Sequence, residues 1–290
     1  MWILDDYPTV ITVMWLPALA YSLFGLILGS FLNVCIHRVP RRESVVWPGS
    51  HCPRCGVAVR PYDNIPLVSY LLLKGKCRSC KGPISLRYPL VELAAGIAFY
   101  ACARAWQLTP PTFVNSLFIG LIIVLALIDY DHQILPNVFT LPGTLIGILL
   151  SPFQDPALYR EAAARAVAVS LSPESPETML PWVASLLGAI VGAAFILLTG
   201  FLYQIVRKRQ GLGMGDVKMM AMVGAFLGWR LALLTIFAGS LSGSFVGIFL
   251  IRFRGESLQT KLSFGTFLGC GAVISLFFGV PFIHWYTRTV

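Results

Sequence analysis

Four cysteines form the pattern in this sequence that is most specific to one kind of chemistry. Cys52 and Cys55 make one C-x-x-C pair, and Cys77 and Cys80 make a second pair after 21 intervening residues. Two thiolates at this spacing bind one metal ion from a single turn, and two such turns complete a tetrahedral zinc site. Four thiolates leave no open coordination position, so we expect a structural zinc ion rather than a catalytic one.

The same cysteines have two alternative interpretations, a pair of disulfides or a redox site. Disulfides are rare in a reducing cytosol, and a thioredoxin-like site needs only one C-x-x-C pair. The other three cysteines, Cys35, Cys102 and Cys270, lie in apolar runs, where we expect them to act as small hydrophobic residues.

Two aspartates are the candidates for catalysis. Asp129 directly follows an apolar run at 113–128, and Asp216 directly follows the glycine-rich segment 211–215. Two carboxylates held close together share a proton, so that one serves as general base and the other as general acid. Such a pair can activate a water molecule for attack on a peptide carbonyl and protonate the leaving amine.

Spacing alone leaves other roles open for these acidic residues. Asp216 is equally placed to cap the helix that follows it, and Asp129 to be an interfacial residue. Asp131 competes with Asp129, because it lies only two residues further on. Glu92 is a secondary site candidate, although stabilisation of a helix N-terminus explains it better.

His132 and Lys218 are expected to be interfacial rather than catalytic residues. The segment Gly213-Met-Gly-Asp216 does not predict a nucleotide site, because no strand precedes it and it does not match G-x-G-x-x-G.

Composition places all these residues in a membrane protein. Hydrophobic residues make up 57% of the 290-residue chain and charged residues 12%, about half the share that a soluble domain needs. A soluble single domain, a disordered chain and a disulfide-stapled secreted module are excluded. Eight apolar runs are predicted as membrane spans, at 7–34, 89–103, 113–128, 134–153, 182–206, 216–229, 231–251 and 264–286. Only Arg230 separates the sixth run from the seventh, which leaves a count of seven open.

We therefore expect an all-α polytopic membrane protein of about eight transmembrane helices. Its predicted parts are a first span at 1–36, a small zinc-binding cytoplasmic loop domain at 37–88, and a polytopic membrane domain at 89–290 that carries the two aspartates. The loop domain holds ten Lys and Arg against two acidic residues. Basic loops beside apolar spans are typical of the cytoplasmic side, and no base-reading module supports nucleic-acid binding.

With that loop inside and the spans alternating, 17 of the 22 Lys and Arg lie on the cytoplasmic side. Both termini are then outside. Asp129 and Asp216 both fall at the cytoplasmic face of the membrane, although neither contributed to the charge count.

The order of these motifs resembles the type IV prepilin peptidases, which are bifunctional leader peptidases and N-methyltransferases of pilus and type II secretion systems. The likeness covers nearly the whole chain and rests on residues 29–40, 52–55, 64–70, 75–80, 87–93, 128–136 and 213–218. It implies a G-x-G-D aspartyl protease with Asp129 and Asp216 as the catalytic pair, and so favours Asp129 over Asp131. Asn137 departs from the pattern, since many relatives carry aspartate after Leu-Pro.

The resemblance also implies the reaction partners. The expected substrates are prepilins or pseudopilins, which carry a short basic leader before a hydrophobic helix and are cut at the cytoplasmic face of a bacterial inner membrane. The new N-terminal residue is then methylated from S-adenosylmethionine. No residue pattern in the chain identifies the methyl-donor site, so this second reaction rests on the resemblance alone.

Two rival functions are a protease without methylation, and a zinc-stabilised transporter or assembly scaffold with the aspartates as proton-relay groups. Relay carboxylates usually lie near the middle of a span, whereas Asp129 and Asp216 are expected at one face.

Overall fold

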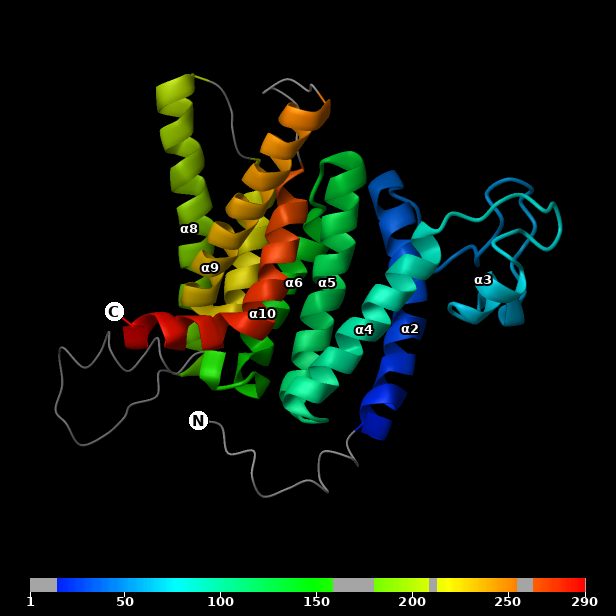
Figure 1. Cartoon of the computed structure of the whole chain (residues 1–290), viewed down its shortest axis with the longest axis horizontal. Coiled ribbons are helices and arrows are strands. Elements are labelled where there is room, and N and C mark those ends of the chain that lie inside the picture. The colour runs from blue at the N-terminus through cyan, green and yellow to red at the C-terminus, as the bar shows by residue number, and fades with distance from the viewer. Residues whose placement is uncertain (1–14, 159–179, 209–212, 255–262, 290) are drawn as a thin grey trace. The chain divides into compact units, whose positions relative to one another are not determined.

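The computed structural model describes residues 15–158, 180–208, 213–254 and 263–289. The regular elements of these residues are all helices, and no strand occurs among them (Figure 1). The elements are α2 (Trp15–Arg38), η1 (Val39–Arg41), η2 (Pro61–Asn64), α3 (Val68–Leu72), α4 (Arg87–Trp106), α5 (Pro110–His132), α6 (Asn137–Leu150), η3 (Ser151–Phe153), α8 (Pro181–Arg207), α9 (Met214–Arg254) and α10 (Phe264–Thr289). The chain forms two compact units, an N-terminal unit of residues 1–124 and a C-terminal unit of residues 125–290, and α5 runs from one into the other.

In the N-terminal unit, α2 and α4 pack together through small residues. A Cβ atom added at Gly29 on α2 would lie 2.7 Å from Cα of Glu92 on α4. The hydroxyl of Ser22 donates a hydrogen bond of 2.9 Å to the carbonyl oxygen of Gly96. Small residues and interhelical hydrogen bonds of this kind drive helix association in membranes, where apolar burial gains little.

The loop between α2 and α4 holds the two cysteine pairs. Its first part is tied to the end of α2 by Arg38, whose buried guanidinium donates to the carbonyl oxygens of Ser44 at 2.9 Å and Gly49 at 3.2 Å. The only regular elements in this loop are η1, η2 and α3. The loop therefore has little regular secondary structure of its own to stabilise it.

In the C-terminal unit, α8 and α9 meet at two glycines. A Cβ atom on Gly188 would overlap the carbonyl oxygen of Gly224, and one on Gly224 would overlap that of Gly188. The Ser185 hydroxyl reinforces this contact by donating a 2.6 Å hydrogen bond to the carbonyl oxygen of Ala225. Around the contact, α9 buries Met219, Met220, Met222, Val223 and Phe226 as the core of the unit.

Helix α9 contains the break that the sequence predicted near Arg230. The break lies two residues earlier, at Gly228, whose φ of 77° and ψ of 169° are not helical. Residues with a side chain rarely adopt this conformation. The sixth and seventh predicted spans are thus two parts of one kinked element.

Five described helices, α2, α5, α8, α9 and α10, are long and apolar enough to cross a membrane. This confirms the all-α polytopic class. Each of the eight predicted runs corresponds to a helical segment, but α6 has only 14 residues and α4 carries three charged side chains. The number of crossings therefore remains a prediction. The start of the first run, at residues 7–14, lies outside the described residues.

The substitution Gly224→Ala should destabilise the protein by roughly 1–3 kcal/mol, because the new methyl group meets rigid backbone rather than a side chain that can turn away. Gly120→Ala on α5 is the matched control, because no atom lies within 4 Å of its added Cβ and alanine favours the helix. The check is the apparent melting temperature of each variant in one detergent. Equal values for the two variants would disprove the close contact of α8 with α9.

Candidate active site and metal centre

Asp129 lies in the last turn of α5, with 6% of its surface exposed. Its Oδ2 accepts a hydrogen bond of 2.9 Å from the backbone N–H of Thr266, and the N–H of Gly265 also donates to the carboxylate. Both donors belong to the first turn of α10, where backbone N–H groups lack helical partners and the helix dipole attracts negative charge. The start of α10 therefore holds the Asp129 carboxylate in place.

Gly265 is required for this arrangement on steric grounds. A Cβ atom at this position would lie 2.9 Å from Oδ2 of Asp129 and 3.1 Å from Cδ1 of Leu135. Any side chain here would push the carboxylate away from the N-terminus of α10.

Asp216 is the third residue of α9, and 9% of its surface is exposed. Its Oδ2 accepts the backbone N–H of Gly213 at 3.2 Å, and its own N–H donates to the carbonyl oxygen of Gly213 at 3.1 Å. The bond from the Gly213 N–H to the Asp216 carboxylate is the half of a capping box in which the side chain of the third helical residue reaches back to the N-cap. The Asp216 carboxylate therefore caps the start of α9, and the same carboxyl group also faces a cavity.

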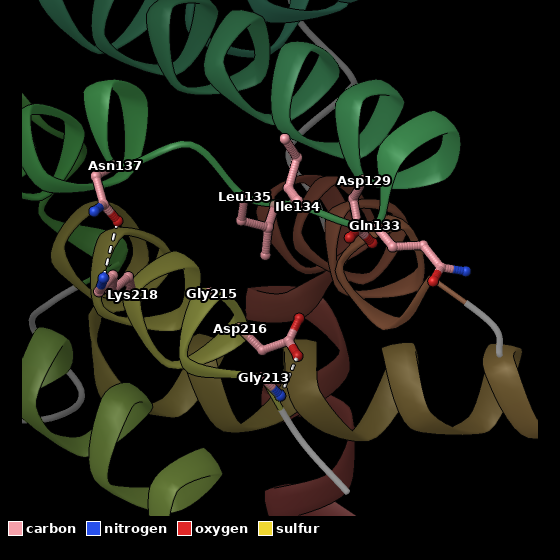
Figure 2. Close-up of a pocket in the computed structure, with 9 residues that line it drawn as sticks. All are labelled: Asp129, Gln133, Ile134, Leu135, Asn137, Gly213, Gly215, Asp216 and Lys218. Carbon is pink, nitrogen blue, oxygen red and sulfur yellow. Dashed lines mark hydrogen bonds between the residues drawn. The ribbon is translucent and has the colours of Figure 1, made fainter. Parts of the chain in front are cut away.

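Asp129 and Asp216 line one cavity of about 300 Å³ within the C-terminal unit. Figure 2 shows the two carboxyl groups facing a common space, one from α5 and the other from α9. The lining consists of Asp129, Gln133, Ile134, Leu135, Asn137, Gly213, Gly215, Asp216 and Lys218. Two acidic groups that are distant in sequence therefore line the same cavity.

Several residues of this site were not recognised from the sequence. Gln133, Ile134 and Leu135 belong to the short non-helical link between α5 and α6; they lie in the segment 128–136 that carries the family resemblance, but no role was predicted for them. The contact of Asp129 with Gly265 and Thr266 had no such signal, because it joins segments 137 residues apart.

Asn137 and Lys218 lie together on the cavity wall. The Lys218 Nζ donates a hydrogen bond of 2.9 Å to Oδ1 of Asn137. The partner of Lys218 at this position is thus a neutral amide. Lys218, expected to be merely interfacial, is part of the cavity lining.

The structure separates the remaining candidates from this cavity. Asp131 and His132 are exposed at the end of α5 and are not among its lining residues. Glu92 belongs to the N-terminal unit, where its Oε2 accepts the backbone N–H of Leu67 at 2.9 Å and its carboxylate also hydrogen-bonds Ser30. Glu92 therefore joins the cysteine loop to α4, and the expectation that it stabilises the N-terminus of its own helix was wrong.

The four loop cysteines converge as predicted. Their sulfur atoms all lie within 4.8 Å of one another, and the sulfurs of Cys52 and Cys80 are 3.9 Å apart. This cluster can hold a metal ion. All seven cysteines are free thiols, and Cys35 and Cys102 are buried as expected, whereas Cys270 is exposed on α10.

The two cysteine pairs have the same pattern of backbone hydrogen bonds. The N–H of Cys52 donates to the carbonyl oxygen of Val57 at 2.9 Å, and the N–H of Cys77 donates to that of Gly82 at 2.8 Å. Backbone N–H groups of Cys55 and Arg54 hydrogen-bond the Cys52 sulfur and lower the pKa of this thiol to about 6. N–H groups directed at sulfur favour the thiolate, which is the form that binds metal.

A second contact links the cysteine pairs to the rest of the loop. Arg78, between Cys77 and Cys80, donates to both carboxylate oxygens of Asp63 at 2.8 and 2.6 Å. The hydrogen bonds from Arg78 lower the pKa of Asp63. This pair therefore stabilises the loop above the usual carboxyl pKa, and its contribution is lost as the pH falls through the lowered value.

The chain is also similar to known proteins over most of its length. Fold and site define a polytopic helical membrane protein with two buried aspartates at one cavity and a four-cysteine loop. Residues 23–106 match the bacterial peptidase A24 N-terminal domain, and residues 116–248 match the type IV leader peptidase family. The chain belongs to the type IV leader peptidase family.

Its relatives include three proteins named prepilin leader peptidase/N-methyltransferase. The protein of Pseudomonas aeruginosa is 35% identical over 289 residues, which cover 92% of each chain. That of Myxococcus xanthus is 40% identical over 243 residues, covering 83% of this chain and 66% of the relative. That of Pseudomonas putida is 30% identical over 280 residues, covering 89% of each. No solved structure matches the chain.

The residue that follows the second cysteine differs between the two cysteine turns, and this difference gives a prediction. Gly56 and Lys81 each follow the second cysteine of a pair and have φ values of 70° and 58°. This left-handed conformation costs a residue with a side chain roughly 1–2 kcal/mol. Lys81→Gly should therefore raise the affinity for Zn²⁺ by roughly fivefold, and Gly56→Ala should lower it by a similar factor. Competition with a chromophoric chelator measures both, and unchanged or opposite effects would contradict the equivalence of the two turns.

Proposed function

We propose that this chain cleaves the basic leader from type IV prepilins and pseudopilins and methylates the new N-terminal residue. Membership of the leader peptidase family and the names of the relatives support both reactions. The observation that carries the peptidase assignment to particular residues is the convergence of Asp129 and Asp216 on one cavity. They are the proposed catalytic pair.

The hydrogen bonds suggest which aspartate acts as general base and which as general acid. Asp129 accepts N–H groups at the N-terminus of α10, and these donors favour the charged carboxylate. Beside that charge, Asp216 holds the shared proton more readily. In the proposed reaction Asp129 takes a proton from a water molecule, whose oxygen attacks the carbonyl carbon of the scissile peptide bond. Asp216 then gives its proton to the leaving nitrogen as the C–N bond breaks.

The position of the carboxylates disfavours a transporter or a proton-relay scaffold. Asp129 is three residues before the end of α5, and Asp216 is the third residue of α9. Relay groups usually lie near the middle of a span and face a polar path. Two aspartates at helix ends suit a substrate that lies at the membrane surface.

The cysteine cluster supports a structural zinc ion bound by Cys52, Cys55, Cys77 and Cys80. Four sulfurs within 4.8 Å suit a tetrahedral thiolate site, and the loop has few buried apolar residues of its own. The bound ion would hold the two cysteine turns together, with no part in the chemistry at the aspartates. S-adenosylmethionine is the proposed methyl donor on the strength of the relatives' names, and no residue of this chain is assigned to it.

We further propose that the protein crosses a bacterial inner membrane several times, with the cysteine loop and both aspartates at the cytoplasmic face. The excess of Lys and Arg on that side supports this orientation. In functional terms the chain divides into a first span at 1–36, a zinc-binding loop domain at 37–88, and a membrane domain at 89–290 that carries the peptidase site. The compact units of the fold divide elsewhere, after residue 124.

The test of this function is a cleavage assay with purified prepilin, S-adenosylmethionine and the protein in lipid. Asp129→Asn and Asp216→Asn should each lower the cleavage rate at least about 100-fold, because each removes a proton-transfer group. Asp131→Asn is the matched control, since it makes the same change on an exposed residue of α5 and should cleave normally. Mass spectrometry follows loss of the leader and gain of one methyl group.

Normal cleavage by either Asp129→Asn or Asp216→Asn would contradict the proposed pair. Cleavage without methylation by the wild-type protein would restrict the function to proteolysis. If several prepilins remained uncut by the wild-type protein, the transporter or scaffold function would be favoured instead.

A further inference from the structure

Helix α3 exposes an apolar surface in the middle of a polar loop. Its residues Val68, Leu71 and Leu72 are exposed, and the two leucines have 73% and 77% of their surface free. The loop around them is rich in Lys and Arg. A cluster of exposed leucines in such a loop indicates a surface that contacts another apolar phase or partner.

One hydrogen bond fixes the position of α3 along the axis of the neighbouring helix α4. Leu67, immediately before α3, donates its N–H to Glu92 of α4 at 2.9 Å. Glu92 is five residues past Arg87, the first residue of α4, which corresponds to about 7 Å along a helix axis. The start of α3 therefore lies beside α4, below its charged end.

A contact between Glu92 and α2 also indicates how far along the long helices α3 lies. The Glu92 carboxylate also hydrogen-bonds Ser30, which lies eight residues before Arg38 at the end of α2. Eight residues correspond to about 12 Å of helix. Figure 1 shows α3 to the side of α2 and α4, level with part of their length rather than beyond their ends. Because the part of α2 that is long and apolar enough to cross a membrane includes Ser30, the start of α3 lies level with this part of α2 and not beyond it.

The charges around α3 match the headgroup region of a bilayer. Lys74 and Lys76 follow the helix within four residues. The guanidinium groups of Arg60 and Arg78 lie 5.8 and 5.5 Å from the centre of the Tyr62 ring, which is itself exposed. Apolar side chains beside Lys, Arg and Tyr are typical of segments that lie in the membrane interface, where basic groups attract anionic lipids.

We propose that α3 is an interfacial membrane anchor. Val68, Leu71 and Leu72 enter the apolar edge of the bilayer that α2 crosses, and Lys74 and Lys76 bind anionic headgroups. The anchor holds the four-cysteine loop against the membrane surface, and the hydrogen bond from Leu67 to Glu92 sets its depth. Lipid is the occupant of this surface, rather than the substrate or a second copy of the chain.

The test places a photoreactive p-benzoylphenylalanine at Leu72 of the full chain, in nanodiscs of phosphatidylcholine and phosphatidylglycerol. The matched control carries the same residue at Val57, an exposed apolar position in the first cysteine turn. Mass spectrometry after illumination should find phospholipid adducts at position 72 with a yield about tenfold above that at position 57.

Metal content equal to that of the unmodified chain shows that each labelled protein is folded, and Leu71 offers a second labelling position on the same helix. Lipid adducts at 71 or 72 well above those at 57 support the anchor. Equal lipid yields at all positions would overturn it. Crosslinks from α3 mainly to peptides of this chain, or to added prepilin, would also overturn it and assign the surface to a protein partner.

Discussion

The proposed peptidase site depends on the interaction of two carboxylates with the N-termini of two helices. Asp129 accepts backbone N–H groups of Gly265 and Thr266 at the start of α10, and Asp216 accepts the N–H of Gly213 at the start of α9. Each helix start has N–H groups that no helical carbonyl can satisfy, so it attracts and orients an anion. This constraint explains how two acidic groups can remain fixed at the ends of apolar helices.

The packing of the C-terminal unit positions the helix N-termini that bind the two carboxylates. The start of α9 carries Asp216, and α9 is held against α8 by the contact of Gly188 with Gly224. Gly265 leaves room for the Asp129 carboxylate at the start of α10. Small residues thus set the helix positions, which in turn set the carboxyl groups. The N-terminal unit follows a different plan, in which Glu92 and the cysteine cluster fix a loop that has little core of its own.

Much of this could be predicted from the sequence, and the reasons are local. The C-x-x-C pairs specify their own turns, so Cys52, Cys55, Cys77 and Cys80 met as expected. Apolar runs specify helices, because a membrane requires every backbone group to be hydrogen-bonded within its own segment. Of the aspartates, Asp129 was separated from Asp131 only by resemblance to a family, and the structure independently buries Asp129 and exposes Asp131.

The features that could not be predicted are contacts between distant segments. The donors to Asp129 come from residues 265 and 266. The local sequence at the end of α5 does not indicate that it contacts the start of α10, and the reverse is also true. Glu92 was misjudged for the same reason, since its partner Leu67 lies in a different element. The break in α9 was predicted at the charged Arg230, whereas the backbone breaks at Gly228, where no side chain opposes a positive φ. A charged residue in an apolar run thus indicates roughly where a helix breaks, but the break itself occurs at a nearby glycine that can adopt a positive φ.

The most direct test of the claim that α10 holds the proposed catalytic residue Asp129 is the single-turnover cleavage rate of Gly265→Ala. The added methyl group meets Oδ2 of Asp129 at 2.9 Å and must displace it. A displacement of this size should slow cleavage by about tenfold to 100-fold, while methylation of an already cleaved pilin continues at the wild-type rate. Cleavage by Gly265→Ala at the wild-type rate would contradict the account.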